Sequence, residues 1–547
     1  MSWLHTWSGL TMGWVVYVVF VAGSLSFFRG EITAWMQPEL QAARPDRGAG
    51  LDRAVALLTA AAPKTSEWSI ALPGPRSAVY VLSWRDGRPS ANRGMEPGTG
   101  EKARAGRGPG PETGAADGPR AHHQIIMDPA TGAVLTPRRT AGGNFIYDLH
   151  FQLYGMPPLM GKWIIGIATM GMFVALISGI IIHRNIFKDF FTFRPGKGKR
   201  SWMDGHNVVG VAALPLHLIL TFSGLLLLGV ELLPLVGSAA YHGNPMGFEA
   251  DLHRGKPAPG SDPSLDAPMP LTDLKTIVAQ AARQSPEGGV AHIAIMKPGR
   301  AGALIETALL GGDIFGRHGL PTLLFDGVTG RQIERSKHPR AWPMVVWNFA
   351  IATHIGGYAA PFLRWVMFGS GVLGSLMIAS GLVMWLVARQ RERANLGRTP
   401  RGHRLVEVLN VGVVAGMLVA LAAYFWSNRL IPAELAGRDR LEIAAFFLAW
   451  LLALLHAVAR PHRHAWIEQL CAAGVLTATL PVLNGLSGGR FAWQSFADGQ
   501  MQVASFDCAA LAVGLALLLV ARKVSAHGSG SGSRTKLSAR STRATVN

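Results

Sequence analysis

The sequence predicts a mostly α-helical, polytopic membrane bundle of about eight transmembrane (TM) helices, with two α+β domains outside the membrane. Two observations predict this fold class. Of the 547 residues, 49% are hydrophobic and 16% are charged, whereas soluble domains carry roughly 25% charged residues. The apolar residues also gather in runs of about 20, the length of a helix that crosses a ~30 Å hydrocarbon layer.

The apolar runs are separated by loops of very different length. Eight runs lie near residues 8–28, 163–182, 207–230, 365–388, 408–428, 443–459, 469–489 and 500–521. The long hydrophilic loops 37–145 and 238–340 are each large enough to fold. Asp507 interrupts the last run, where it could serve a proton or quinone site or could lie at the interface near a helix N-terminus.

These runs and loops define the expected organisation of the chain. The Gly/Pro/Arg-rich insert 86–121 cannot bury a core, so it is expected to be disordered. The expected segments are the first span (1–36), a first outer domain (37–145), spans two and three (146–237), a second outer domain (238–340), the fourth span (341–395), spans five to eight (396–525) and a disordered cytoplasmic tail (526–547).

Positive charge predicts the orientation. Lys and Arg are dense in the short loops after spans two, four and six and in the C-terminal tail, and such loops stay on the cytoplasmic side. Both termini are therefore expected in the cytoplasm of a bacterial inner membrane, with both long loops in the periplasm. The same flanks explain the net charge of +19, so the lipid bilayer is an expected partner and nucleic acid is not.

The N-terminal run is interpreted as a retained span. It lacks the basic region of a typical secretory signal. Cleavage near Ala22–Ser24 is the alternative, and it would remove His5. The two cysteines, Cys471 and Cys508, lie in the last two runs, so the outer domains are expected to fold without disulfides.

The two outer loops repeat one plan. Each begins with a helical pattern (51–62 and 271–284), continues into strand-like segments, and contains the turn sequence Asp-x-(Val/Ala)-Thr-Gly, at Asp128–Gly132 and at Asp326–Gly330. Such a turn is an ordinary β-turn when taken alone. Because it occurs twice at matching places, the loops resemble two copies of the PepSY domain, and we expect a PepSY-like α+β fold for each.

Histidines in the apolar runs repeat as well. An imidazole in an apolar span is costly and needs a metal, a proton path or a polar partner. Aligning span one on span three matches His5 with His206 and Gly23 with Gly224. Spans two and four match His150 with His354, and Ser178-Gly179 with Ser380-Gly381. The core is therefore expected to be two copies of one unit, in which a span, an outer domain and a second span follow one another.

A pseudo-twofold axis along the membrane normal would bring equivalent histidines together. This predicts an inner pair, His5 with His206, and an outer pair, His150 with His354. Two imidazoles from facing helices are a common axial set for haem b. One haem in each leaflet would form a transmembrane path for electrons.

Two further histidines leave the assignment open. His183 ends span two, and His217 lies within span three, where a continuous helix would place it on the same face as His206, roughly 16 Å away. Either could replace a member of the pairs, although neither has a histidine counterpart in the other repeat. For each of these histidines, a hydrogen-bonded interfacial imidazole is the alternative.

Several motifs together resemble the PepSY-associated transmembrane helix family over residues 1–395, and specifically its iron-uptake branch of inner-membrane siderophore reductases. The motifs are Leu4–Leu10 (Leu-His-x-Trp-x-Gly-Leu), Leu149–Leu153 (Leu-His-Phe-x-Leu), Ser178–Arg184 (Ser-Gly-Ile-Ile-Ile-His-Arg), Asp204–Gly210 (Asp-x-His-Asn-x-x-Gly) and Leu214–His217 (Leu-Pro-Leu-His).

The resemblance implies an oxidoreductase that carries two haem b groups and passes electrons to a periplasmic ferric siderophore or other iron chelate. The axial iron ligands would come from His5, His206, His150, His354, His183 and His217. No plausible nucleotide-binding fingerprint is present, so the donor would be quinol or a cytoplasmic reductase. The alternatives are a non-catalytic sensor or protease regulator, which binds peptides or metal through its outer domains, and an iron-chelate permease.

Overall fold

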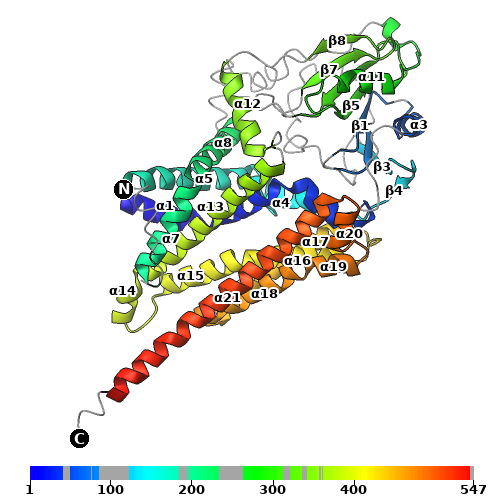
Figure 1. Cartoon of the computed structure of the whole chain (residues 1–547). Helices are drawn as coiled ribbons and strands as arrows, with labels where there is room; N and C mark the ends of the chain where they lie inside the picture. Colours follow the sequence, from blue (N-terminus) through cyan, green and yellow to red (C-terminus); the bar gives the residue numbers. More distant parts are fainter. Residues whose placement is uncertain are drawn as a thin grey trace.

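The structure, a computed structural model, places the helices and a β-sheet in separate regions (Figure 1). It describes residues 1–40, 50–63, 65–74, 77–85, 122–183, 194, 196, 198–232, 263–311, 321–335, 342–356, 359 and 361–541. The disorder expected for 86–121 falls outside these residues. The segment expected to be a disordered tail begins within the last helix, which continues to Ser541.

The helices confirm a bundle with up to eight spans. Within the described residues, seven helical segments are long and apolar enough to cross a membrane, and a bent pair supplies the eighth. The segments are α1 (Ser2–Ser26), α5 (Pro158–Ile182), α13 (Pro361–Ala388), α15 (Arg401–Leu409) with η3 (Asn410–Ala415) and α16 (Gly416–Leu430), α17 (Arg438–Ala459), α18 (His462–Ala478) with α19 (Leu480–Leu486), and α21 (Met501–Ser541).

The third expected span is not one straight helix. It consists of α7 (Lys199–Ala212) and α8 (Leu214–Leu232), and the axes of Lys199–Ala212 and Leu214–Gly229 differ by 68°. Pro215 explains the break, because a proline has no N–H and its ring clashes with the carbonyl four residues earlier. The expectation that His206 and His217 share one continuous helix face is therefore wrong.

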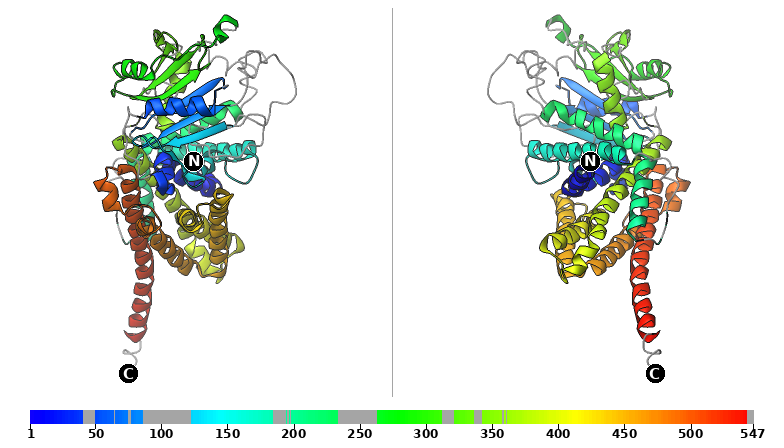
Figure 2. Two further views of the ribbon diagram at one scale, coloured as in Figure 1. Left: turned by 90° about the vertical axis from the view of Figure 1, so that its right-hand side faces the viewer. Right: turned by 90° about the vertical axis from the view of Figure 1, so that its left-hand side faces the viewer.

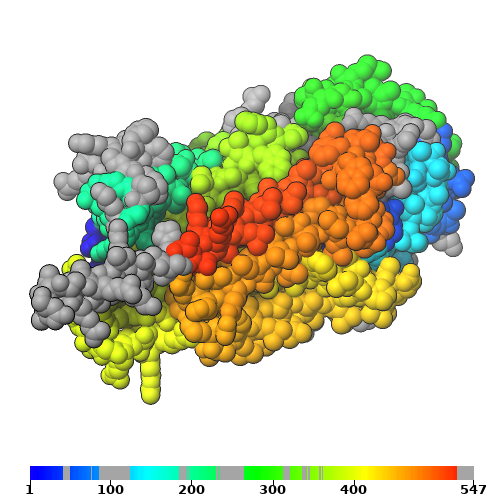
Figure 3. Space-filling model, turned by 60° about the horizontal axis from the view of Figure 1, so that its bottom comes forward, coloured from blue at the N-terminus to red at the C-terminus, as the bar shows by residue number. Residues whose placement is uncertain are grey.

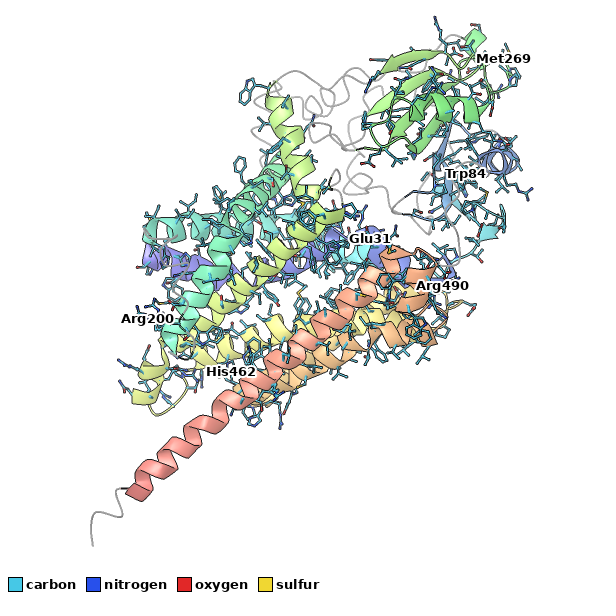
Figure 4. The ribbon with its side chains drawn as sticks, in the orientation of Figure 1. Glu31, Trp84, Arg200, Met269, His462 and Arg490 are labelled. Atoms are coloured by element: carbon cyan, nitrogen blue, oxygen red, sulfur yellow. The ribbon has the colours of Figure 1, made fainter. Side chains whose placement is uncertain are left out.

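Shorter helices lie between the spans and within the outer region. They are α2 (Arg29–Met36), η1 (Pro38–Leu40), α3 (Leu51–Ala61), α4 (Gly142–Phe151), η2 (Pro263–Asp266), α11 (Leu274–Ala282), α12 (Trp342–Ile355), α14 (Gln390–Asn395) and α20 (Ala492–Ala497). Figure 4 shows the two ends of the molecule: Glu31 and Arg490 lie toward the sheet, which carries Trp84, whereas Arg200 and His462 lie toward the opposite end.

Strands from the two long loops form one antiparallel sheet in the order β4-β3-β2-β1-β5-β6-β7-β8. Their bounds are β1 (Glu67–Ala71), β2 (Tyr80–Arg85), β3 (His122–Met127), β4 (Val134–Leu135), β5 (Val290–Met296), β6 (Leu304–Leu309), β7 (Thr322–Asp326) and β8 (Gln332–Arg335). Each loop supplies four consecutive strands, and β1 pairs with β5 at the centre, where Ile70 lies opposite Ile293. The two expected α+β units are therefore joined edge to edge.

One hydrophobic core serves both units. Leu58 of α3 and Ile277 of α11 are fully buried together with the central strand residues Ile70 and Ile293. Figure 2 shows the sheet and its helices beyond one end of the helical bundle. Burying α3 and α11 in the same core removes apolar surface from both units at once, which favours the joined sheet.

The repeated turn has the same geometry in both units. Oδ1 of Asp128 accepts hydrogen bonds from the backbone N–H groups of Ala130 and Thr131, and Oδ1 of Asp326 accepts them from Val328 and Thr329. The closing glycines have φ of +68° at Gly132 and +72° at Gly330. Because L-residues with a side chain rarely adopt this conformation, the repeat requires glycine at both positions.

The four C-terminal spans lie side by side along the repeat core (Figure 3, yellow to red). Polar contacts join them to α1: Nε1 of Trp14 donates to Oδ1 of Asn410 at 3.0 Å, and the hydroxyl of Tyr17 donates to the carbonyl of Val414 at 3.2 Å. Both acceptors belong to the π-helical turn η3. This turn therefore attaches the C-terminal bundle to α1.

Acidification is expected to loosen the centre of the sheet. Nε2 of His292 on β5 lies 2.6 Å from Oγ of Ser69 on β1. Burial lowers the pKa of His292, and Glu306 opposes this only in part. In the unfolded chain His292 has its ordinary pKa of about 6.5 and binds a proton more readily than in the folded sheet. The free energy of unfolding therefore decreases as the pH falls below about 6.5. Hydrogen exchange of β1 and β5, corrected for intrinsic rates, should be faster at pH 5 than at pH 7, and His292→Gln should remove the difference. Equal protection of the unsubstituted protein at both pH values would contradict this.

Candidate functional site

The inner pair consists of one side chain from α1 and one from α7. His5 is in the first turn of α1 and His206 is in α7. Their ring centroids are 6.3 Å apart and the ring planes are 81° apart. A cavity between the helices is lined by both rings, by His183 and by small or apolar residues of α5 and α7. Residues separated by about two hundred positions in the sequence thus meet inside the bundle.

The outer pair lies at the end of the bundle nearer the sheet. His150 is in the last turn of α4 and His354 is in the last turn of α12. Their ring centroids are 5.9 Å apart, with the planes inclined by 29°. The structure therefore brings together the same residues that the repeat alignment pairs.

Each of the four rings is held by a hydrogen bond on Nδ1. In the first repeat the partners are backbone carbonyls, those of Ala175 for His5 at 2.9 Å and Val19 for His150 at 2.8 Å. In the second repeat they are serine hydroxyls, Ser380 for His206 at 3.1 Å and Ser223 for His354 at 2.9 Å. The bond fixes each ring and leaves Nε2 for another ligand.

A glycine lies against each of the four rings. A Cβ at Gly23 would be 2.6 Å from Cε1 of His150, and a Cβ at Gly224 would be 3.0 Å from the same atom of His354. At the inner pair the corresponding distances are 3.3 Å for Gly179 and His5, and 3.2 Å for Gly381 and His206. The missing side chains therefore let each imidazole lie close to the backbone of the neighbouring helix.

His183 and His217 occupy different surroundings from the two pairs. His183 follows α5 directly and lines the cavity of the inner pair, so it remains a neighbour of His5 and His206. His217 is fully buried, and its Nε2 lies 2.9 Å from the carbonyl oxygen of Ser370. Its ring packs edge-on against Phe20. His217 thus contacts α1 and α13 and joins neither pair.

Asp507 is a structural contact between helices. Its side chain is 1% exposed, so it is buried among helices of the protein; its position at the membrane interface stays a prediction. Oδ1 accepts a hydrogen bond from Nε1 of Trp35 at 2.8 Å and Oδ2 accepts one from Nδ2 of Asn484 at 3.2 Å. The carboxylate therefore joins α21 to α2 and α19. Burying a charged carboxylate costs free energy unless such donors satisfy it.

Part of the site was not identified from the sequence. The repeat alignment marks the four glycines and Ser380, but it does not show that they contact histidine rings. No sequence motif marks Ser223, and the carbonyls of Val19 and Ala175 belong to the backbone, so their residue types do not reveal them as hydrogen-bond acceptors. The alignment could have pointed to Ser223, because that residue precedes Gly224.

Comparison with known proteins identifies the family. The family model of the PepSY-associated TM region matches residues 2–388, which include both histidine pairs and all eight strands. Comparison with curated proteins gives no match. The match covers well over half of the chain, so this protein belongs to the PepSY-associated TM family. The C-terminal spans lie outside the matched region.

Proposed function

We propose that this member of the PepSY-associated TM family is a two-haem membrane reductase. In this proposal His5 and His206 hold one haem b, His150 and His354 hold the other, and electrons cross the bilayer to a ferric chelate on the side of the sheet. The observation that carries the proposal is the meeting of two symmetric histidine pairs, each ring fixed by a bond on Nδ1.

The distances within the pairs suit a shared metal ion. Bonds from an imidazole nitrogen to a metal such as zinc are about 2.0–2.1 Å long, so two rings on opposite sides of one ion have centroids roughly 6 Å apart. The pairs have centroids 6.3 Å and 5.9 Å apart. Among the described residues, no group of three or more His, Cys, Asp and Glu side chains is placed to hold a metal ion. A haem requires only two axial ligands from the protein.

The surroundings of the rings fit the role of axial ligands. A ligating histidine usually donates its other ring N–H to a carbonyl or similar acceptor, which fixes the tautomer and makes the ligating nitrogen more basic. The carbonyls of Ala175 and Val19 accept in this way from His5 and His150. When bound, haem supplies one-electron chemistry. The chain itself orients the imidazoles and keeps them within an apolar bundle.

The two pairs lie toward different ends of the bundle, as a path across the membrane requires. His5 lies at the start of α1, whereas His150 and His354 lie in the short helices α4 and α12 on the side of the sheet. Positive charge in the loops after spans two, four and six supports a cytoplasmic location for the end opposite the sheet. We therefore assign the protein to a bacterial inner membrane, with the sheet in the periplasm.

A ferric chelate is the proposed electron acceptor. Fe(III) is held by hard oxygen ligands, and reduction by one electron to Fe(II) weakens this binding and releases the metal. The joined sheet would bind the chelate above the outer pair. The proposed donor is quinol or a cytoplasmic reductase, because the sequence contains no plausible nucleotide-binding fingerprint.

Histidine substitutions separate the two haems. The purified chain should show a Soret band that shifts on reduction with dithionite. His206→Ala should remove about one of two haems, because it deletes one ligand of the inner pair alone, and His354→Ala should remove the other. His217→Ala should retain both, because this ring bonds to Ser370 and lies outside both pairs. Pyridine haemochrome analysis gives the stoichiometry.

Other outcomes of this experiment would contradict the proposal. Loss of both haems or of neither in His206→Ala would refute the pairing, and loss of haem in His217→Ala would make that residue a ligand. A folded preparation that stays colourless when haem is added would favour a sensor or a permease over a reductase.

Glycine substitutions test the packing of the rings. Gly23→Ala should weaken the outer haem, because its Cβ would lie 2.6 Å from the ring of His150. Gly9→Ala, in the same helix, is the matched control, since its Cβ would meet no heavy atom within 4 Å. Haem retention during gel filtration measures the difference. Equal retention in the two variants would show that Gly23 does not determine the position of the ring.

A further inference from the structure

The C-terminal bundle binds the start of the helix that carries His150. Oε2 of Glu442, in α17, accepts a hydrogen bond from the hydroxyl of Thr140 at 2.6 Å and one from the backbone N–H of Ala141 at 3.3 Å. Ala141 is the N-cap residue of α4. A carboxylate at this position satisfies a free backbone donor and interacts favourably with the positive end of the helix dipole.

Glu442 is itself held in place by buried partners. Its other oxygen, Oε1, lies 3.0 Å from Nη1 of Arg438 and accepts a hydrogen bond from Nδ2 of Asn428 at 2.8 Å. The side chains of both Arg438 and Glu442 are 0% exposed. Arg438 also donates to the carbonyls of Asn428 and Ile431 at the end of α16 and to that of Arg139 before α4. The ion pair thus joins the C-terminus of one helix to the N-terminus of another.

Aromatic contacts extend this interface along α4. The hydroxyl of Tyr424 donates to the carbonyl of Gly142 at 2.8 Å. Phe145 is 2% exposed, and its ring lies 5.1 Å from the rings of Tyr424 and Phe446 and 6.0 Å from that of Phe447. The start of α4 therefore receives polar contacts and aromatic packing from the C-terminal bundle, in addition to a hydrogen bond from the N–H of Gly143 to Oγ1 of Thr33 in α2 at 2.9 Å.

The equivalent helix of the second repeat is more exposed. Phe349 corresponds to Phe145 in the repeat alignment, yet its side chain is 40% exposed, and Trp342 at the start of α12 is 75% exposed. His150 and His354 thus lie on helices that the rest of the protein covers to different extents. The C-terminal spans contact the helix of His150.

We infer that Glu442 is a positioning residue, which acts from the C-terminal bundle to fix the first turn of α4 and thereby the ring of His150 in the outer pair. The inference rests on the proposed function where it treats His150 as a haem ligand. It gives a role to spans that the family match does not cover, because these spans would set the geometry of the outer haem.

The test compares two buried glutamates of the same bundle in the full chain. Glu442→Gln removes the charge and one acceptor at α4. Glu407→Gln is the matched control, because Glu407 is also buried, with an exposed fraction of 5%, and also pairs with arginines, Arg393 and Arg404. It lies at the other end of the bundle. Thr140→Val removes the hydrogen bond from the Thr140 hydroxyl to Glu442, together with the one that this hydroxyl accepts from the N–H of Gly142, and it keeps the charge of Glu442.

Two readouts separate positioning from a general loss of stability. Paramagnetic resonance of the oxidised protein should show a change in one low-spin haem signal only, and retention of that haem should fall roughly 10-fold, as is usual when a group that orients a metal ligand is removed. Hydrogen exchange of residues 142–151 should become faster. Thr140→Val should change the same signal and the same amides to a smaller extent, and Glu407→Gln should change neither.

The outcomes also distinguish this inference from the proposed function. If the unsubstituted chain holds no haem, the proposed function fails, and hydrogen exchange of α4 alone then decides whether Glu442 positions His150. Unchanged protection of α4 in Glu442→Gln overturns the inference whatever the haem content. Equal changes in both haem signals, or the same changes in Glu407→Gln, also overturn it.

Discussion

The meeting of equivalent imidazoles from two repeats is the constraint on which this structure depends. An imidazole within an apolar bundle needs partners for both nitrogens. In all four rings Nδ1 has a partner from a neighbouring helix, and a glycine of a neighbouring helix lets the ring lie close to its backbone. These requirements place a glycine and a hydrogen-bond partner for Nδ1 next to each ring in both repeats. They explain why Gly23 and Gly224, and Gly179 and Gly381, repeat together with the histidines.

The sheet follows the same internal symmetry. Each repeat contributes four strands, and the pairing of β1 with β5 lies between the two halves. A unit of four strands would leave β1 or β5 as an open edge, and exposed edges pair readily with other strands. Pairing the two edges with each other satisfies their backbone groups and buries α3 and α11 in a single core. The outer region and the membrane bundle are thus both built by bringing two copies of one unit together.

Periodicity and repetition in the sequence predicted the spans, the strand-turn units and the pairing of His5 with His206 and of His150 with His354. These features follow from local pattern or from alignment of the chain on itself. The 68° bend before Pro215 was missed, although this proline lies inside the expected span 207–230 and interior prolines break or kink helices; the residue alone does not give the angle. The joined sheet and the burial of Asp507 were not predicted, since no repeated residue marks the pairing of β1 with β5 or the contacts of Asp507 with Trp35 and Asn484. The role of Glu442 was hidden for the same reason.

The C-terminal spans add support for one side of this symmetric core, and the histidine pairs remain its centre. The central claim is that each pair binds one iron ion through both imidazoles. Low-temperature magnetic circular dichroism of the purified, oxidised full chain tests this most directly, because it reports the axial ligands of each haem. The account requires two low-spin ferric haems, each with two histidine ligands. Absence of porphyrin, or haem with a single histidine ligand at either position, would contradict it.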